Sequence, residues 1–337
     1  MRGLIVVTPT SLVQAPRHLE PLRAAGYEVR VNAAGRLLGE AELAALAAGA
    51  RGLIVSTEPV TAAVMDRAGP GLRVIARYGA GTDNVDVAAA TERGIVVCNT
   101  PGANDVAVAE LTLALMLALA RHIPAAHDGV RQGRWERPVG MELRGKELGL
   151  IGAGRIGLEV ARLARAVGMT VTYCDPVRRP DAEARLGLRF APLDEVLAQA
   201  DVVSVHVPLT PATRHLIGAR ELSLMRPGAL LINTSRGGVV DEGALLAALN
   251  EGRLAGAALD VFAEEPPAPT HPLVGHPKVI HTPHLGARTR EAVARMAQGA
   301  VAAVLDVLAG RRPQHVVNPE VYPAAGGPAA AGTGPRA

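Results

Sequence analysis

The sequence predicts an α/β protein built from two doubly wound parallel sheets. Short runs of valine, isoleucine and leucine alternate with alanine- and leucine-rich helical patterns along nearly the whole chain. This alternation is typical of parallel strands joined by crossover helices. With 337 residues the chain has room for about two domains. The core must be largely aliphatic, because 49% of the residues are hydrophobic and only 2% are aromatic.

The first sheet is expected before residue 102. Its strands are predicted at Leu4 to Val7, Glu28 to Val31, Leu53 to Val55, Val74 to Ala76 and Ile95 to Val97. Pro101-Gly102 ends this pattern. A helix with Asn104 or Asp105 as its N-cap is predicted to run to about His122 and to lead into the second domain.

The second sheet is expected to have six strands, which fit a full doubly wound sheet. They are predicted at Leu148 to Ile151, Thr170 to Cys174, Val202 to Val205, Leu230 to Asn233, Gly256 to Leu259 and Val279 to His281. A helix from Thr289 to about Leu308 is long enough to return to the first domain, which would then be discontinuous. We expect a substrate domain at 1–101 plus 287–323, a cofactor domain at 102–286 and a disordered tail at 324–337, with hinges at Pro101-Gly102 and Leu285-Gly286.

The composition argues against several classes of partner. The net charge is only +3 and the basic residues are dispersed, so neither nucleic acid nor a membrane surface is expected. The longest apolar block, Leu111 to Ala120, is about half of a membrane span and is better explained as a buried helix. Cys98 and Cys174 lie in apolar runs typical of reduced thiols, and the N-terminus lacks a signal-peptide pattern, so we expect a cytoplasmic protein.

A glycine-rich turn predicts a dinucleotide site. Gly152, Gly154 and Gly157 form a GxGxxG pattern between an apolar strand and a helical stretch. In such a turn the first glycine permits the tight bend, the second lets the backbone approach a pyrophosphate, and the third lets the helix pack close to the strand. The phosphates then lie at the helix N-terminus.

Asp175 indicates which dinucleotide is preferred. It ends the next predicted strand, 18 residues after Gly157, where an acid accepts hydrogen bonds from the adenine ribose hydroxyls. A 2′-phosphate would be repelled there, so NAD is favoured over NADP. Arg178 and Arg179 follow closely and leave the strictness of this preference open.

Three further segments are predicted at or just beyond strand ends, where doubly wound sheets bind ligands. The first places Arg236 at a glycine-flanked turn, where its guanidinium could grip a carboxylate. The segments around Asp260 to Glu265 and His281 to His284 offer acid–base groups. A neighbouring carboxylate favours the charged form of a histidine, which suits it to deliver a proton to a carbonyl oxygen.

At these residues the chain resembles the D-2-hydroxyacid dehydrogenase family, including its short, phosphoglycerate-dehydrogenase-like members. Besides the glycine turn, the resemblance rests on motifs spread over nearly the whole chain. They are Arg77-Tyr-Gly-Ala-Gly-Thr-Asp-Asn-Val-Asp86, Asn99-Thr-Pro-Gly102, Ala107-Val-Ala-Glu110, His206-Val-Pro-Leu-Thr210, Asn233-Thr-Ser-Arg-Gly-Gly238, the Asp-Val-Phe segment at 260 to 262 with its Glu-Pro, and Pro283-His-Leu-Gly286.

The resemblance implies a role for each matching residue. Arg236 would bind the substrate carboxylate and polarise the keto oxygen, His284 would be the general acid/base, and Glu265 would be hydrogen-bonded to that histidine. The implied cofactor-binding residues are Gly152, Gly154, Arg155, Ile156, Gly157, Asp175, His206, Val207, Thr234, Asp260, His284 and Gly286. The implied substrate-binding residues are Arg77, Gly79, Ala80, Gly81 and Arg236. Tyr78 replaces a small residue of some members; it either narrows the pocket or simply packs.

The expected function is hydride transfer between NAD and C2 of a D-2-hydroxy acid by a homodimer, formed through the cofactor domain near Gln132 to Trp135. The substrate could be 3-phosphoglycerate, with Arg51 or Arg77 meeting its phosphate, or hydroxypyruvate or glyoxylate. The alternatives are an NADH-sensing, corepressor-like binding protein and a phosphite- or formate-type dehydrogenase; Glu265 argues against the formate type, where a glutamine is expected. No metal site is expected, because His281, His284 and Glu265 lack a further ligand at a usual spacing.

Overall fold

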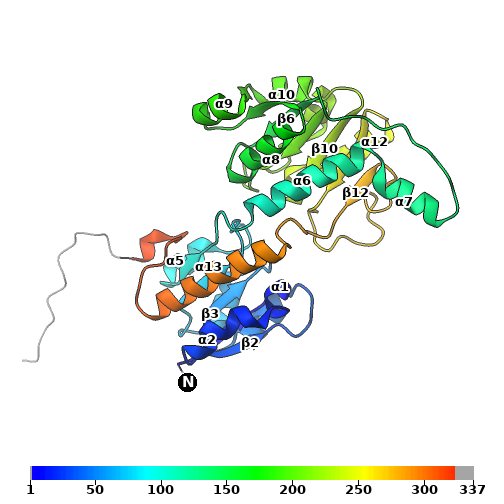
Figure 1. Cartoon of the computed structure of the whole chain (residues 1–337). Coiled ribbons are helices and arrows are strands. Elements are labelled where there is room, and N and C mark those ends of the chain that lie inside the picture. Colours follow the sequence, from blue (N-terminus) through cyan, green and yellow to red (C-terminus); the bar gives the residue numbers. More distant parts are fainter. Residues whose placement is uncertain (1, 323–337) are drawn as a thin grey trace, which may run out of the picture. The chain divides into compact units, whose positions relative to one another are not determined.

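The computed structural model describes residues 2–322 of the chain. They form two compact units (Figure 1). Within the described residues, unit 1 contains residues 2–101 and 294–322, and unit 2 is Gly102–Val293. The second crossing between the units therefore lies inside the last long helix rather than at residue 287. The predicted tail at 324–337 lies outside the described residues.

Unit 1 is a five-stranded parallel sheet in the order β2-β1-β3-β4-β5. Its strands are β1 (Leu4–Val7), β2 (Glu28–Val31), β3 (Ala50–Val55), β4 (Val74–Arg77) and β5 (Val96–Cys98). Its helices are α1 (Thr10–Val13), η1 (Pro16–Leu19), α2 (Glu20–Ala24), α3 (Glu40–Ala47), α4 (Ala62–Ala68), α5 (Val87–Glu92) and η3 (Pro319–Val321), and α13 (Arg290–Leu308) crosses into it from unit 2. This order is the doubly wound arrangement that the alternating pattern predicts.

Unit 2 is a seven-stranded parallel sheet in the order β12-β11-β10-β9-β6-β7-β8. Its strands are β6 (Glu147–Ile151), β7 (Thr170–Cys174), β8 (Arg189–Phe190), β9 (Val202–Val205), β10 (Ala229–Asn233), β11 (Leu254–Leu259) and β12 (Val279–His281). Its helices are α6 (Asp105–Ala120), α7 (Ile123–Arg131), α8 (Arg155–Ala166), α9 (Pro180–Leu186), α10 (Leu193–Gln199), α11 (Ala219–Leu224), η2 (Gly237–Val239) and α12 (Glu242–Asn250). The doubly wound class is confirmed, but the expectation of six strands is wrong.

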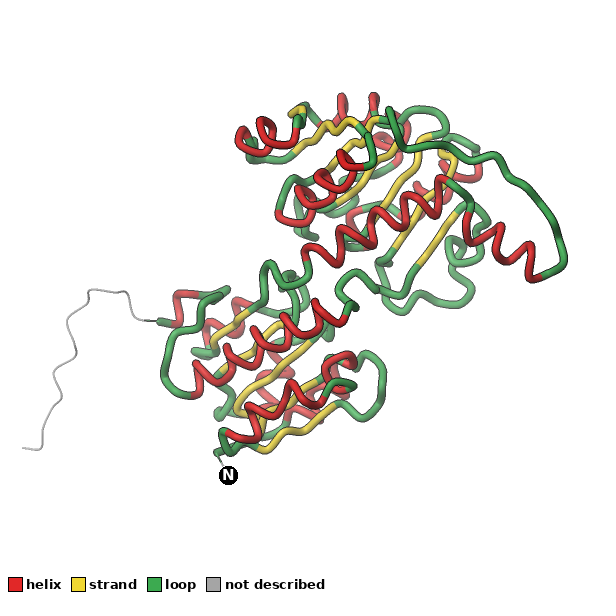
Figure 2. Tube along the Cα trace, in the orientation of Figure 1, coloured by secondary structure: helices red, strands yellow, loops and turns green. Residues whose placement is uncertain are grey.

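Each sheet is flanked by helices, as Figure 2 shows for the strands in yellow and the helices in red. In unit 2, one apolar cluster joins the sheet to α6 and α8, and a second joins its other face to α10, α11 and α12. Neighbouring residues of one strand supply opposite clusters, as Val202 and Val203 do, because side chains alternate across a strand. The core is therefore aliphatic on both faces, as the composition requires.

No single helix among residues 2–322 is long and apolar enough to cross a membrane. The helices α6 and α7 reach the necessary length only together, and they are bent by 61° at the break between them. Both cysteines are free. Burial raises the pKa of Cys98 to about 12 and that of Cys174 to about 11, so both thiols stay protonated at neutral pH.

The glycine turn between β6 and α8 has a steric cause that can be tested. A Cβ on Gly157 would lie 2.1 Å from the Gly152 carbonyl oxygen, whereas nothing lies within 4 Å of a Cβ on Gly154. Gly157→Ala should therefore force the backbone apart at a cost of about 1–3 kcal/mol, which lowers the melting temperature by roughly 3–10 °C. Gly154→Ala should leave it within about 2 °C of the wild type.

The comparison is made by differential scanning fluorimetry of the three proteins without ligand. Equal melting temperatures for both variants would contradict the steric explanation of Gly157.

Candidate active site

The predicted site residues of unit 2 lie at one edge of its sheet. Neighbouring strands in the sheet are parallel, so all of their carboxyl ends meet at that edge. Arg236 follows β10, Glu265 follows β11, and His284 follows β12; these three strands are consecutive in the sheet. The topology thus brings together residues that are far apart in the sequence.

The glycine turn fits the pyrophosphate of a dinucleotide. Gly152 has a φ of 94°, a conformation that favours glycine. The first hydrogen bond inside α8 runs from the Leu158 amide to the Gly154 carbonyl, so the amides of Arg155 and Ile156 point beyond the helix start. Because the space beside Gly154 is open, an anion can approach these amides and the positive end of the helix.

Asp175 lies beside this turn at the end of β7. Its carboxyl oxygens accept hydrogen bonds from the amides of Ala153 and Val177, both at 2.8 Å. Arg179 lies 3.7 Å from the same carboxyl group. The acid is therefore held at the edge of the glycine turn, as the spacing from Gly157 suggests.

Arg178 is held by a separate network. Its guanidinium donates two hydrogen bonds to Glu183, at 2.9 and 2.8 Å, and its Cζ lies 5.9 Å from the centre of the Phe190 ring. The Tyr173 hydroxyl also donates to Glu183, at 2.8 Å. This network pairs the Arg178 guanidinium with an acid on α9. The sequence does not reveal it, because Glu183 has no motif of its own.

His206 and Val207 close the other side of the glycine turn. A Cβ on Gly152 would lie 2.9 Å from the His206 carbonyl and from Val207. The His206 ring is hydrogen-bonded to the Ser204 hydroxyl at 2.8 Å, and burial lowers the pKa of His206 to about 3. This imidazole is therefore neutral at physiological pH. Directly after β10, the Thr234 hydroxyl contacts that of Thr112 on α6, at 2.9 Å.

His284 and Glu265 form the predicted acid–base pair. The Nδ1 atom of His284 lies 2.7 Å from a carboxyl oxygen of Glu265. The other carboxyl oxygen accepts the Phe262 amide at 3.1 Å. The two side chains are 30% and 27% exposed, so a ligand can reach the ring. The Glu265 carboxyl thus fixes the orientation of the histidine.

Asp260 fixes the turn that carries His284. Its carboxyl accepts hydrogen bonds from the Thr282 hydroxyl at 2.5 Å and from the amides of Leu285 and Gly286 at 2.7 and 2.9 Å. Burial raises the pKa of Asp260, and these hydrogen bonds oppose the rise. Leu285 and Gly286 are therefore held by Asp260 inside unit 2, which extends to Val293, and the hinge expected at these two residues stays a prediction.

Arg236 projects from a turn that is closely packed. The Asn233 side chain accepts the Ser235 amide at 3.0 Å and donates to the Arg236 carbonyl at 2.8 Å. A Cβ on Gly237 would lie 1.9 Å from the Phe262 carbonyl carbon, so the turn after β10 lies directly against the segment that leads to Glu265. Arg236 is half-buried and its guanidinium donates to the Ser235 carbonyl at 2.8 Å.

The predicted substrate residues of unit 1 follow β4. Gly79 has a φ of 139°, and its amide donates to the Thr100 hydroxyl at 2.9 Å. Asn99 donates to the Ala80 carbonyl at 2.7 Å, which fixes the loop from Gly79 to Gly81. Tyr78 is only 4% exposed and contacts the Ser11 hydroxyl at 3.4 Å, so its ring packs inside unit 1.

Sequence reasoning missed one partner at the dinucleotide turn. Asp105, the first residue of α6, accepts a hydrogen bond from Nε of Arg155 at 2.7 Å. The Arg155 side chain is therefore paired with an acid, while the amide of the same residue lies at the open start of α8. The sequence indicates Asp105 only as a helix cap, because a pair 50 residues apart leaves no local signal.

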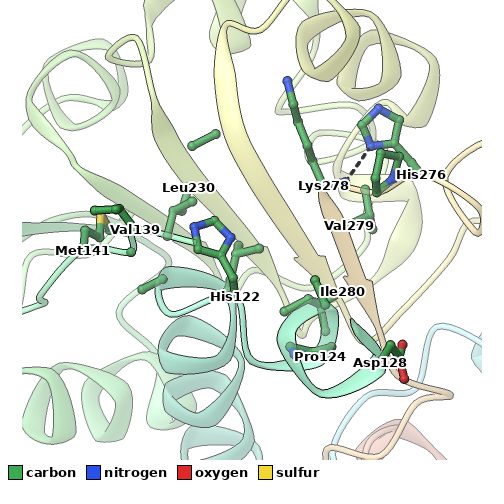
Figure 3. A pocket seen from close by; sticks show the side chains of 16 residues that line it. His122, Pro124, Asp128, Val139, Met141, Leu230, His276, Lys278, Val279 and Ile280 are labelled. Carbon is green, nitrogen blue, oxygen red and sulfur yellow. Dashed lines mark hydrogen bonds between the residues drawn. The ribbon is translucent and has the colours of Figure 1, made fainter. Parts of the chain in front are cut away.

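The opposite edge of the unit 2 sheet holds a pocket of about 520 Å³. It is lined by residues near the amino ends of β10, β11 and β12, by α7 and by Val139 to Met141, as the close-up in Figure 3 shows for its labelled side chains. In this pocket His276 accepts a hydrogen bond from the Lys278 amide at 3.1 Å. None of the predicted site residues line it. Among the described residues, no group of three or more His, Cys, Asp or Glu side chains could hold a metal ion.

Comparison with known proteins identifies a family for this chain. Residues 113–286 match the family described as D-isomer specific 2-hydroxyacid dehydrogenase, NAD binding domain. The chain is 45% identical over 294 residues to the D-3-phosphoglycerate dehydrogenase of Sus scrofa, covering 86% of this chain but 55% of that protein. It is 46% identical over 261 residues to the glyoxylate reductase of Aeropyrum pernix, covering 75% of this chain and 78% of the relative. The chain thus spans about half the length of the phosphoglycerate dehydrogenase that it matches.

Solved structures lead to the same family. The crystal structure of the TT0316 protein from Thermus thermophilus has a TM-score of 0.84 and 44% sequence identity, and covers 93% of this chain and 99% of that one. A glyoxylate reductase from Paecilomyes thermophila has a TM-score of 0.82 and 30% identity, with coverage of 94% and 99%. The chain therefore belongs to the D-isomer specific 2-hydroxyacid dehydrogenase family, and residues 113–286 form its NAD-binding domain.

Proposed function

We propose that this protein interconverts a 2-oxo acid and the corresponding D-2-hydroxy acid. The observation that carries the proposal is the His284–Glu265 pair, 2.7 Å apart at the carboxyl edge of an NAD-binding domain. NAD, when bound, supplies or accepts the hydride. The protein must therefore hold the acid, orient its carbonyl or hydroxyl group, and move one proton.

His284 is the group that moves the proton. A carboxylate can only accept a hydrogen bond, so Nδ1 of His284 carries a hydrogen toward Glu265 and Nε2 is left for the substrate. In the direction of reduction, Nε2–H donates its proton to the keto oxygen. In the direction of oxidation, the neutral Nε2 accepts the hydroxyl proton. Glu265 stabilises the charged imidazolium in both directions.

Arg236 is the group that binds the acid end of the substrate. Its guanidinium can bind a carboxylate in a bidentate geometry while one N–H polarises the neighbouring keto oxygen. The rigid Asn233 turn and the close contact of Gly237 with Phe262 support this role, because they limit the freedom of the turn that carries the side chain. For unit 1, the proposal is that the amides of Ala80 and Gly81 also bind the carboxylate; the Gly79 amide already donates to the Thr100 hydroxyl, so the expectation that it binds the substrate is not supported.

The protein is proposed to act as a homodimer through the NAD-binding domain. Four large apolar side chains of α7 and the following segment are exposed: Ile123 by 56%, Val130 by 54%, Trp135 by 81% and Val139 by 94%. Such a set on one short stretch is typical of an interface. A cytoplasmic location stays a prediction from the sequence.

Removing the proton carrier tests the proposed function. His284→Ala should lower kcat for NADH-dependent reduction of a 2-oxo acid by about 10²- to 10⁴-fold, while NADH binding stays within about threefold of the wild type. Glu265→Gln should lower kcat less, because the amide still orients the ring but no longer stabilises its charge. Absorbance at 340 nm gives the rates, and fluorescence titration gives the NADH affinity.

A panel of glyoxylate, hydroxypyruvate, pyruvate and phosphohydroxypyruvate is used as substrates. If the wild type binds NADH but reduces no acid, or if His284→Ala keeps full activity, the proposal is wrong.

Cofactor preference tests the roles of Asp175 and Glu183. Asp175→Asn should raise the NADPH-to-NADH ratio of kcat/KM by roughly tenfold, because it removes a charge that repels a 2′-phosphate. Adding Glu183→Gln should raise the ratio further, because Arg178 loses its charged partner and can bind that phosphate. Glu159→Gln removes a similar partner from Arg162 on α8 and serves as the control. An unchanged ratio in the double variant would show that neither acid sets the preference.

The dimer proposal is tested by placing a charge on the exposed apolar stretch. Val130→Asp should shift the protein toward monomer in multi-angle light scattering after gel filtration, since an unpaired charge in an apolar interface costs several kcal/mol. Val177→Asp is the matched control, because Val177 is similarly exposed at 56% but lies elsewhere on unit 2. A wild type that is monomeric at micromolar concentration would refute the proposal.

A further inference from the structure

The loops that follow β3 and β4 in unit 1 form one continuous edge. The two strands are parallel neighbours in the sheet, so their carboxyl ends lie together. The side chain of Asn84 donates to the carbonyl groups of Ser56 and Glu58, at 3.0 and 2.7 Å. This fixes the segment from Ser56 to Glu58 beside the segment that contains Gly79 to Gly81. Residues 56–58 therefore lie at the same edge of the unit 1 sheet as the glycine loop.

Glu58 is the charged residue of that neighbouring segment. It is only 1% exposed, and one of its carboxyl oxygens accepts the Ser56 amide at 2.7 Å. In the part of the chain that the structure describes, no Lys, Arg or His nitrogen lies within ion-pair distance of it. A buried carboxylate that no cation offsets acts on nearby anions with little screening. The edge of unit 1 therefore disfavours a second negative charge on a ligand.

Arg51 does not supply a positive charge at the carboxyl edge near Glu58. It is the second residue of β3, whereas the loop begins after Val55, the last residue of that strand. At about 3.3 Å per residue, roughly 13 Å of strand separates Arg51 from the carboxyl edge. Its side chain packs instead against Gly3, where a Cβ would fall 2.4 Å from Cδ of the arginine. The expectation that Arg51 meets a phosphate is therefore not supported.

The Arg77 side chain contacts the glycine loop itself. It is 6% exposed, and its Nη1 atom donates to the Tyr78 carbonyl. A Cβ on Gly79 would lie 1.9 Å from that same nitrogen. The guanidinium thus lies directly against the loop that is proposed to bind the substrate carboxylate. Its positive charge therefore favours the acid end of the substrate rather than a charged group at the opposite end.

We propose that the carboxyl edge of unit 1 selects a 2-oxo acid with an uncharged tail over its phosphorylated counterpart, and that Glu58 is a specificity-determining residue. This inference rests on the proposed function and narrows its substrate class. The substrates that fit are small and unphosphorylated, such as glyoxylate or hydroxypyruvate. A 3-phosphooxy tail would bring two negative charges toward the Glu58 segment.

Hydroxypyruvate and phosphohydroxypyruvate test the inference directly, because they differ only in the phosphate group. Initial rates of NADH oxidation give kcat/KM for both acids with the wild-type chain at low ionic strength. We expect hydroxypyruvate to be preferred by at least about 100-fold. A preference for phosphohydroxypyruvate, or equal values, would overturn the inference while leaving the proposed function intact. Failure to reduce any acid of the panel, pyruvate and glyoxylate included, would instead refute the proposed function.

Variants then test the role of Glu58. Glu58→Gln keeps an acceptor for the Ser56 amide but removes the charge. It should therefore lower the ratio of kcat/KM for hydroxypyruvate to kcat/KM for phosphohydroxypyruvate by about tenfold, because the value for phosphohydroxypyruvate alone rises. Glu58→Asp keeps the charge and should keep the preference, which separates charge from any loss of stability. Glu92→Gln, which changes an exposed acid of the same unit, should leave both substrates unaffected. An unchanged preference in a folded Glu58→Gln protein would show that Glu58 does not determine specificity.

Discussion

The site of unit 2 depends on the buried carboxyl of Asp260. This one group accepts hydrogen bonds from Thr282, Leu285 and Gly286, and the carbonyl of the same residue accepts the His284 amide at 2.9 Å. His284 has a φ of 52°, which costs a non-glycine residue about 1–2 kcal/mol. The surrounding hydrogen bonds hold that conformation, so the ring faces Glu265. The end of β11 thereby fixes the turn after β12, and the acid–base pair follows from this link.

Much of this arrangement can be predicted from the sequence, because it is encoded locally. The glycine turn, the strand that follows it and Asp175 occupy a single continuous stretch, and apolar runs define most of the strands. The carboxyl-edge rule then brings Arg236, Glu265 and His284 to one side without any coordinates. Their grouping follows from parallel topology alone, although the 2.7 Å contact between His284 and Glu265 does not.

The remaining features have no local signal. Strand β8 is only two residues long, Arg189–Phe190, and pairs with β7 at the sheet edge, so it is too short to show a period. The pair Arg155–Asp105 joins residues 50 positions apart, and the hydrogen bond between Thr112 and Thr234 joins residues 122 positions apart. The position of Arg51 on the far half of β3 depends on where the strand begins, and sequence patterns define strand boundaries poorly.

These long-range pairs show how the positive charges of the arginines near the dinucleotide turn are balanced. Three arginines near the dinucleotide turn each have an acid beside them: Arg155 has Asp105, Arg178 has Glu183, and Arg179 has Asp175. Their charges are thus largely offset before any ligand arrives, and we propose that the backbone amides at the start of α8 supply most of the binding of a pyrophosphate. Amides act only at short range and in fixed directions. The proposed recognition of the pyrophosphate therefore depends on the shape of the glycine turn rather than on these three arginines.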